Sequence, residues 1–300
     1  MRRGNGSTLS LRPDGGGWSR DGKPWEPDGP FYAVLGDPVD HSLSPLFQSA
    51  AMRAEGLPYA YHAVRTSRAD LARIFRDRGG LALRGFNVTA PHKFTAADLC
   101  PVLTAEARLT GAVNTVRLTE GGWEGHNTDV GGLCEVLDDL IGRTPAGHGL
   151  VLGAGGAARA AVVALLESGA DGVCVMARSG SGFEAMSGWL AADAMSGRRV
   201  RLVDWGAPLA EHGMASGFVC VSCLPGGVDL ASLAPAGGTL QPALWLDMNY
   251  ASRAVAPPGV PANRIHDGLP VLLAQGALSF SWWFDRDAPR RVMAEALAGA

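Results

Sequence analysis

Short apolar runs alternate with amphipathic stretches through the first half of the chain. Helical spacing of apolar residues over 44–56 and 67–78, with Leu71, Ile74 and Phe75 on one face of the second, predicts two helices. Runs suited to buried strands fall at residues 31–35, 59–64 and 83–88. Strands that alternate with helices predict an α/β fold with a mostly parallel sheet, whose strand-to-helix loops gather at one edge.

The second half of the chain continues this alternation. A helix at 104–111, a hairpin through 120–122 and a helix at 130–141 lead to a Pro- and Gly-containing linker at 142–149. A second α/β unit follows, with strands expected at 150–152, 172–176, 200–203, 217–222 and 243–248, then a long apolar helix at 268–283 and a shorter helix. Residues 1–30 are rich in Gly, Ser, Arg and Asp, which predicts a flexible tail.

Composition narrows the class of partner. The 300 residues are 47% hydrophobic with a formal net charge of −3, which is typical of a globular protein. The arginines are dispersed, so we expect a small-molecule partner rather than nucleic acid or a membrane surface. Arg159 interrupts the longest apolar stretch, so a bilayer-spanning helix is not expected. Five irregularly spaced cysteines suit a reducing compartment, and together these features predict a cytoplasmic protein.

Cys220 and Cys223 form a CxxC motif at the end of a predicted strand. A three-residue offset in a strand directs two side chains to opposite faces, which is unsuited to a shared metal or a disulfide. We therefore expect buried thiols and no metal site, with zinc or redox use as the alternative.

The segment Gly85-Phe-Asn-Val-Thr-Ala-Pro-His-Lys93 carries the first sign of chemistry. Thr89 can cap a helix and Pro91 suits its first turn, which places Lys93 in that turn. The positive end of a helix favours the neutral amine, so Lys93 is a candidate proton acceptor. Only Lys23 and Lys93 are lysines among 26 basic residues, which indicates either a specific need for an amine or a compositional bias toward arginine.

Other polar residues fall where strand-to-helix loops are predicted. Asp129 can either cap the helix at 130–141 or pair with Lys93 as a proton-transfer partner. Ser44 precedes Pro45 and can serve as a cap, whereas Ser42 has no such role, and both hydroxyls can contact a polyhydroxylated ligand. Gln275 interrupts the long apolar helix, so its amide needs either backbone or ligand partners.

Residues 153–158, Gly-Ala-Gly-Gly-Ala-Ala, lie between a predicted strand and a predicted helix. This GxGxxA pattern in a strand–turn–helix setting predicts dinucleotide binding, with the pyrophosphate at the helix N-terminus. The next strand ends in Ala177-Arg178-Ser179, where an NAD site places Asp or Glu. Arg178 can bind the 2′-phosphate of NADP, so NADP is favoured, with NAD possible and a solvated surface arginine as the alternative.

Taken together, the motifs resemble those of the shikimate dehydrogenase family of NADP-dependent oxidoreductases over about residues 31–285. They occur in the family's order as GDPVDHSLSP (36–45), GFNVTAPHK (85–93), GAVNTV (111–116), GHNTD (125–129), GAGGAARA (153–160), LDMNY (246–250) and DGLPVLLAQGALSF (267–280). The resemblance implies a substrate domain with an open mixed sheet at 31–126, joined by C-terminal helices at 268–300. It further implies a doubly wound Rossmann-type NADP domain at 127–267, with the substrate in a cleft between the domains.

The resemblance also implies roles for single residues. Lys93 and Asp129 would form the proton-transfer pair in the interconversion of 3-dehydroshikimate and shikimate, without a metal. The implied substrate-binding residues are Ser42, Ser44, Thr89, Asn114, Tyr250 and Gln275. The implied cofactor-binding residues are Gly153, Ala154, Gly155, Gly156, Ala157, Arg178, Ser179 and Gly268.

The sequence leaves neighbouring functions open. A paralogue acting on quinate, aminoshikimate or a related cyclitol acid is one alternative, and a ligand-binding homologue without turnover is another. Departures from the family pattern include Gln48-Ser49, Ala177, Ser222-Cys223-Leu224 and Val271, which bear on substrate and cofactor preference. A monomer or homodimer, in primary aromatic biosynthesis or a secondary pathway, is consistent with the sequence.

Overall fold

A computed structural model describes residues 8–14, 16–142, 147–212, 214, 216–230, 233, 240–250 and 254–299. The chain divides into two compact units. Unit 1 contains Met1–Thr128 and Gln275–Ala300, and unit 2 contains Asp129–Ala274. Two helices, α5 (Thr128–Ile141) and α8 (Leu269–Phe284), carry the chain from one unit to the other and back.

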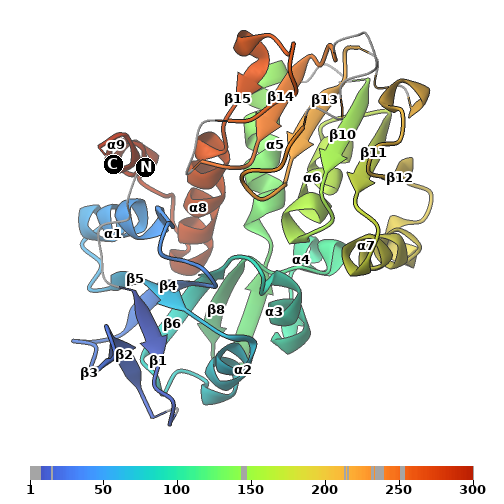
Figure 1. The fold of residues 1–300 in the computed structure, drawn as a ribbon. Helices are drawn as coiled ribbons and strands as arrows, with labels where there is room; N and C mark the ends of the chain where they lie inside the picture. Colours follow the sequence, from blue (N-terminus) through green and yellow to red (C-terminus); the bar gives the residue numbers. More distant parts are fainter. Residues whose placement is uncertain are drawn as a thin grey trace. The chain divides into compact units, whose positions relative to one another are not determined.

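Unit 1 is built on a mixed sheet with the order β3-β2-β1-β5-β4-β6-β8-β9-β7 (Figure 1). The central strands β1, β5, β4 and β6 run parallel, while β8 lies antiparallel to both β6 and β9. The strand bounds are β1 Leu9–Leu11, β2 Trp18–Arg20, β3 Lys23–Trp25, β4 Phe31–Gly36, β5 Ala60–Arg65, β6 Leu83–Val88, β7 Val102–Leu103, β8 Thr115–Thr119 and β9 Gly122–His126.

Helices and one hydrophobic cluster complete unit 1. The helices are α1 (Ser44–Ala54), α2 (Arg68–Asp77), α3 (Lys93–Leu99), α4 (Ala105–Thr110) and α9 (Arg290–Ala298). Helix α2 starts with a capping box, because Ser67 Oγ accepts from the Asp70 backbone N–H and the Asp70 carboxylate accepts from that of Ser67. Its predicted apolar face is buried, and α1 packs against α9.

The predicted flexible tail at 1–30 is wrong for the residues that the structure describes there. Strands β1, β2 and β3 extend the sheet beyond β5, and Leu9, Leu11 and Trp18 are buried in the core of unit 1. The Trp18 indole N–H donates to the carbonyl of Leu81 at 2.9 Å. Average composition hides these strands because each is three residues long and the segments between them are polar.

Unit 2 is a parallel six-stranded sheet with the order β12-β11-β10-β13-β14-β15. The bounds are β10 His148–Leu152, β11 Gly172–Ala177, β12 Val200–Asp204, β13 Val219–Ser222, β14 Leu244–Asp247 and β15 Ile265–His266. Helix α6 (Gly156–Glu167) packs across β10, β11 and β13, and α7 (Ser181–Leu190) packs on β12. Short 3-10 helices lie at Asp193–Met195, Leu209–His212 and Ala262–Arg264.

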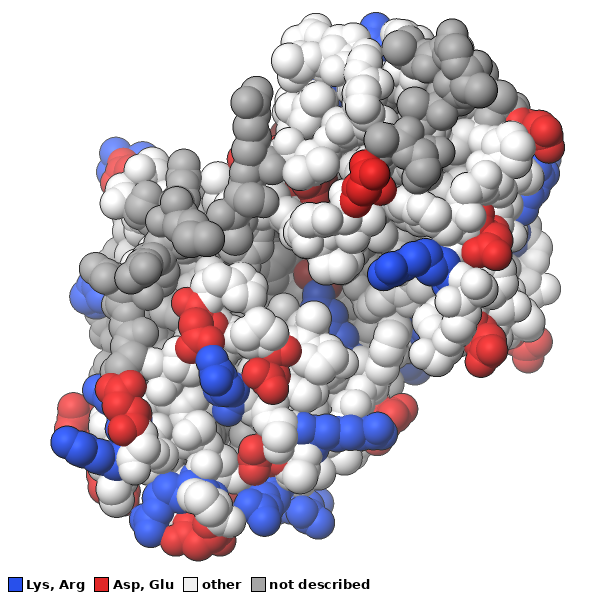
Figure 2. Space-filling view, in the orientation of Figure 1, with Lys and Arg blue, Asp and Glu red and all other residues white. Residues whose placement is uncertain are grey.

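The fold class predicted from the apolar pattern is confirmed, because both units combine sheets containing parallel strands with helices. The two-residue strand β15 was not predicted, because two residues carry no periodic signal. Among the described residues, no helix has both the length and the apolarity needed to cross a bilayer. Basic and acidic side chains are interspersed on the face shown in Figure 2.

Candidate active site

The loop between β6 and α3 carries Thr89 and Lys93. Lys93 is the first residue of α3, as its predicted place in the first turn requires. The prediction that Thr89 caps the helix is wrong, because His92 holds the N-cap position and its backbone N–H donates to the carbonyl of Thr89 at 3.0 Å. Residues 89–92 therefore form a turn, and Thr89 lies at its start, directly after β6.

Buried hydrogen bonds hold this turn. His92 is 4% exposed, and its Nε2 is hydrogen-bonded to the carbonyl of Thr66, which follows β5. The backbone N–H of Val113 donates to the carbonyl of Lys93 at 2.9 Å. That bond joins the start of α3 to the segment that contains Asn114. One backbone contact therefore fixes the main chain at Lys93 relative to the main chain next to Asn114.

Asn114 is 2% exposed, and its amide is oriented by a backbone group. The N–H of Thr128 donates to Asn114 Oδ1 at 2.7 Å. Because a backbone N–H can only donate, the Asn114 atom that faces it is the oxygen. The amide nitrogen then donates to the side-chain oxygen of Gln275 at 3.4 Å, so two predicted substrate-binding residues lie in contact.

Sequence reasoning missed the buried polar network around Asn114. Asn87 Nδ2 donates to Thr115 Oγ1 and to Ser279 Oγ, each at 3.0 Å, and Tyr61 donates to Asn87 Oδ1 at 2.7 Å. Thr128 Oγ1 lies 3.1 Å from Ser279 Oγ, which joins the first residue of α5 to α8. Asn87 lies within the quoted segment 85–93, but its partners Thr115 and Ser279 are distant in sequence and no local pattern marks them.

Ser42 and Ser44 lie between β4 and α1, where the serine pair was predicted. They are 6% and 5% exposed, and the backbone N–H of Ser44 donates to Ser42 Oγ at 3.3 Å. The capping role considered for Ser44 is wrong, because α1 begins at Ser44 itself and the apolar residue Leu43 holds the N-cap position. Helix capping therefore does not explain the hydroxyl group at position 44.

Asp129 is 5% exposed and lies in the first turn of α5. The alternative that Asp129 caps this helix is wrong, since α5 begins one residue earlier, at Thr128. Asp129 belongs to unit 2, as does Tyr250, which is half-buried after β14. Ser42, Ser44, Thr89, Lys93, Asn114 and Gln275 all belong to unit 1.

The glycine turn of unit 2 has the geometry that its sequence predicts. Gly153 follows β10 with φ +114°, a backbone conformation that favours glycine, and an added Cβ would lie 3.3 Å from the carbonyl of Cys223. Gly155 is the N-cap of α6, and a Cβ added there would meet no described heavy atom within 4 Å. The helix N-terminus is thus approachable, which fits a bound pyrophosphate. Ala154 and Ala157 belong to the same turn and the first turn of α6.

Arg178 and Ser179 follow β11 directly, and both are exposed. The backbone N–H of Ser179 donates to Asp204 Oδ1 at 3.2 Å, and Asp204 ends the neighbouring strand β12. Sequence reasoning missed Asp204, because its place beside Ser179 arises from the pairing of two strands. The Arg178 guanidinium is suited to bind a phosphate, whereas the negative charge of Asp204 would repel one.

Gly268 lies directly before α8, where a side chain is excluded by the backbone. An added Cβ would lie 2.2 Å from the carbonyl oxygen of Met248, and the Gly268 N–H donates to the carbonyl of Asn249 at 3.0 Å. Asp267 Oδ1 accepts from the N–H of Leu269 at 3.0 Å and so satisfies one of the N–H groups at the start of the helix that have no intrahelical partner. The segment after β14, which leads to Tyr250, is therefore fixed against the start of α8.

The prediction of buried thiols in the CxxC motif is confirmed for Cys220 and wrong for Cys223, which is half-buried. None of the five cysteines, all of which the structure describes, forms a disulfide, and Cys220 is fully buried in β13 within the core of unit 2. Burial raises its thiol pKa well above the ordinary value. Among the described residues, no group of three or more His, Cys, Asp or Glu side chains could hold a metal ion.

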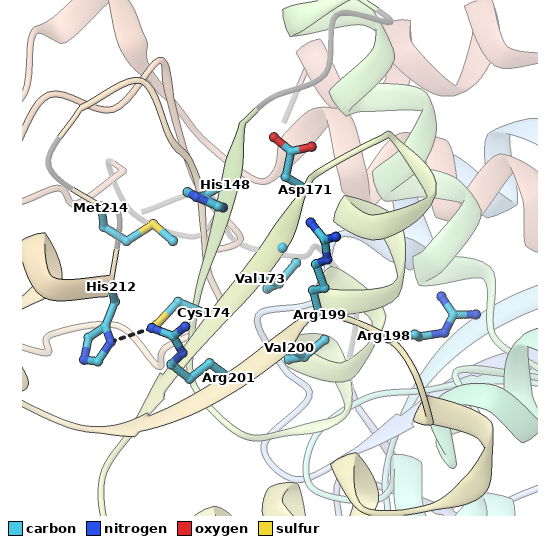
Figure 3. A pocket seen from close by; sticks show the side chains of 11 residues that line it. His148, Asp171, Val173, Cys174, Arg198, Arg199, Val200, Arg201, His212 and Met214 are labelled. Carbon is cyan, nitrogen blue, oxygen red and sulfur yellow. Dashed lines mark hydrogen bonds between the residues drawn. The ribbon is translucent and has the colours of Figure 1, made fainter.

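A cavity of about 340 Å³ in unit 2 contains none of the predicted site residues (Figure 3). It lies around the amino ends of β10, β11 and β12, whereas the glycine turn follows the carboxyl end of β10. Its charged and ionisable lining is His148, Asp171, Arg198, Arg199, Arg201 and His212. Parallel sheets of this class bind nucleotides outside the carboxyl ends of the strands, so this cavity is not the predicted cofactor site.

Comparisons with known proteins match both ends of the chain. Residues 34–116 match the shikimate dehydrogenase substrate binding domain, and residues 268–298 match the shikimate 5′-dehydrogenase C-terminal domain. The shikimate dehydrogenase (NADP(+)) of Anaeromyxobacter sp. strain Fw109-5 is 38% identical over 272 residues, covering 89% of this chain and 95% of the relative. The chain belongs to the shikimate dehydrogenase family.

Solved structures of shikimate dehydrogenases have the same fold. The enzyme from Mycobacterium tuberculosis is 30% identical with a TM-score of 0.72, and the match covers 90% of this chain and all of that one. The enzyme from Thermus thermophilus, solved in complex with NADP(H) and shikimate, is 32% identical with a TM-score of 0.71. That match covers 90% of this chain and 99% of the other. The family's Rossmann-type cofactor domain agrees with the parallel sheet and glycine turn of unit 2.

Proposed function

We propose that this protein interconverts 3-dehydroshikimate and shikimate with NADP(H), and that Lys93 and Asp129 form the proton-transfer pair. The observation that carries the proposal is the part-buried contact of Asn114 with Gln275. It lies in the unit where the Val113 N–H donates to the Lys93 carbonyl and so joins the start of α3 to the Asn114 segment. An amide pair of this kind can both donate and accept, which suits a substrate with several hydroxyls. Unit 2 contributes a glycine turn suited to a dinucleotide.

The bound nicotinamide supplies hydride chemistry at the ring carbon that carries the alcohol or ketone. The chain's own residues carry the proton. In alcohol oxidation the Lys93 amine takes the hydroxyl proton, and in ketone reduction the ammonium returns it. The buried Asp129 carboxylate would orient the amine and share its proton, the usual arrangement for an acid/base group.

Substrate recognition is assigned to hydroxyl and amide side chains. Ser42 and Ser44 would bind the substrate carboxylate with help from Tyr250, since hydroxyls can donate to an anion. Thr89, Asn114 and Gln275 would bind the ring hydroxyls. The Thr128 N–H orients Asn114, so the direction of its amide is set before substrate enters.

Cofactor recognition is assigned to the carboxyl end of the unit 2 sheet. Gly153, Gly155 and Gly156 would allow the pyrophosphate to approach the α6 N-terminus, with Ala154 and Ala157 beside them. Arg178 and Ser179 would bind the 2′-phosphate of NADP. The negative charge of Asp204, next to Ser179, would weaken the binding of that phosphate and so reduce the preference for NADP over NAD. Gly268 would keep the segment at the start of α8 close to the nicotinamide end.

Replacement of Lys93 tests the assigned role. We expect Lys93→Ala to lower kcat by about 10²–10⁴-fold, the usual contribution of acid/base catalysis, while KM changes by less than about tenfold. Lys23→Ala is the matched control, because Lys23 is the other lysine of the chain and lies exposed in β3. Steady-state rates with shikimate and NADP measure both variants, and unchanged turnover of Lys93→Ala would refute the proposed role.

Substrate and cofactor choice are tested together. Initial rates with shikimate and quinate, each with NADP and NAD, should be highest for shikimate with NADP. Higher rates with quinate and NAD would instead assign the protein to a related cyclitol acid. Absence of turnover with every combination, despite binding of substrate, would favour a ligand-binding homologue. We propose a cytoplasmic protein, monomeric or homodimeric, acting in aromatic biosynthesis.

A further inference from the structure

A second cavity lies in unit 1, near the N-terminal strands rather than near the loop that carries Lys93. Its volume is about 300 Å³, at the lower end of the range for small-molecule pockets. Strands β2 and β3, the connection to β4 and the start of β5 contribute its wall, and Figure 1 shows the N-terminal strands beside β5. Residues that define its chemistry are Arg20, Trp25, Asp28, Phe31, Pro58 and His62.

Arg20 supplies a cation with an unmet hydrogen-bonding group. Its guanidinium lies over the Trp25 ring, with its central carbon 4.5 Å from the ring centroid. Its Nε is buried and has no hydrogen-bond partner within the part of the chain that the structure describes. An atom with no accessible surface cannot be reached by a ligand, so the groups of Arg20 open to a ligand in the cavity are the terminal N–H groups of its guanidinium, and a carboxylate is their best-matched partner. The cavity therefore favours a ligand that carries a carboxylate.

The remaining wall is flat and apolar. Trp25 contacts Phe31 and His62 in edge-to-face geometry, with ring centroids 5.9 Å and 5.2 Å apart. Pro27, Pro30 and Pro58 add rigid apolar surface. Burial, helped by the nearby Arg20, lowers the pKa of His62 to about 4, so His62 is neutral near pH 7 and Arg20 remains the cation of the wall. The Asp28 carboxylate is the acidic group of the lining, so it favours a pose in which the ligand's carboxylate lies toward Arg20 and away from Asp28.

Part of this cavity comes from a segment outside the matched substrate-binding domain. Arg20, Trp25, Asp28 and Phe31 all precede residue 34, where that match begins. The cavity is thus separate from the residues assigned to the proposed reaction. The cation and one aromatic ring of its wall, Arg20 and Trp25, come from the N-terminal strands β2 and β3.

We propose that this cavity binds a planar aromatic monocarboxylate, with the carboxylate on Arg20 and the ring against Trp25 and the proline wall. The site is an auxiliary one, so its occupation does not depend on the substrate of the proposed reaction. The carboxylate accepts from the terminal N–H groups of the Arg20 guanidinium. The ring packs on apolar surface that would otherwise face solvent.

Titration with benzoate tests the proposal on the full-length protein. Isothermal titration calorimetry with saturating shikimate present should show benzoate binding, whereas the neutral isostere benzamide should bind at least about tenfold more weakly. Arg20→Met should weaken benzoate binding by at least about tenfold. Arg53→Met is the matched control, because Arg53 is an exposed arginine of α1 in the same unit, and it should bind benzoate like the wild type.

Arg20→Lys is the second variant, since it keeps the charge and loses the paired N–H groups of the guanidinium. Benzoate affinity of this variant should fall between those of the wild type and Arg20→Met, and kcat with shikimate should be unchanged in both. Equal binding of benzoate and benzamide, or equal affinity of wild type, Arg20→Lys and Arg20→Met, would overturn the proposal. Loss of benzoate binding in the presence of saturating shikimate would assign the ligand to the catalytic site and also overturn it.

Discussion

The side chain of Asn114 is held by two segments that follow it at different distances along the chain. Thr128 orients its amide from the start of α5, and Gln275 lies against it from α8. Most of the predicted site residues could be found from local motifs, because strand-to-helix loops and glycine turns have short signatures. The partners that orient them, such as Ser279 and Asp204, could not, since long-range folding brings them into place.

His62 gives a pH dependence at the residue scale. Its pKa is about 4 in the folded chain against an ordinary value of 6.5, so below pH 6.5 the unfolded chain binds the proton first. Folding stability therefore falls as pH decreases from about 6.5 toward 4. Between pH 7 and pH 5 the wild type should lose on the order of 2 kcal/mol more than His62→Phe, which keeps a flat ring and removes the titration.

Urea unfolding at the two pH values measures this difference. Burial also lowers the pKa of His126, so His62→Phe should retain part of the acid sensitivity. Parallel loss of stability in the wild type and His62→Phe would show that His62 does not carry the effect.

At the scale of elements, β1 to β3 are structural parts of unit 1. Most of the alternation of strands and helices from residue 31 onward was predictable, because the elements there are long enough to show their period, apart from the two-residue strands β7 and β15. The N-terminal strands were not predictable, because Trp18 is buried through contacts with segments that are distant in sequence. Its ring lies 5.5 Å from that of Phe31, and its N–H reaches the segment before β6.

Trp18→Ala tests this structural role. Trp18 is 2% exposed, so its loss should lower the free energy of unfolding by about 3–5 kcal/mol through a cavity and an unpaired carbonyl at Leu81. Trp25→Ala is the control from the neighbouring strand, and its partly buried ring should cost less. Chemical denaturation compares the two, and an equal or smaller effect at Trp18 would contradict its place in the core.

At the scale of the whole molecule, each of the two units contains a hydrophobic cluster among its described residues. One cluster contains Phe31 and Phe86, and the other contains Leu150 and Trp245. The predicted linker at 142–149 lies inside unit 2, so the apolar pattern alone did not predict where unit 2 begins, at Asp129. The role of each unit, substrate binding for unit 1 and NADP binding for unit 2, stays a prediction.

Hydrogen exchange can assign a ligand to each unit. At a ligand concentration of 100 Kd, amides that exchange through openings incompatible with binding should slow by about 100-fold. NADP should protect amides around residues 152–160, and shikimate should protect amides around residues 87–93 and 113–115. Protection of the unit 1 segment by NADP and of the unit 2 segment by shikimate would contradict the proposed division of roles.

The N-terminal strands also change which backbone the sheet of unit 1 presents to other molecules. Without them, β5 would be an edge strand with unpaired N–H and carbonyl groups, open to pairing with another chain. With them, the edge is β3, a three-residue strand that contains Lys23 and Pro24. Proline cannot donate a hydrogen bond and lysine resists burial, so the sheet ends in a strand that discourages intermolecular growth and protects the protein from aggregation in a crowded solution.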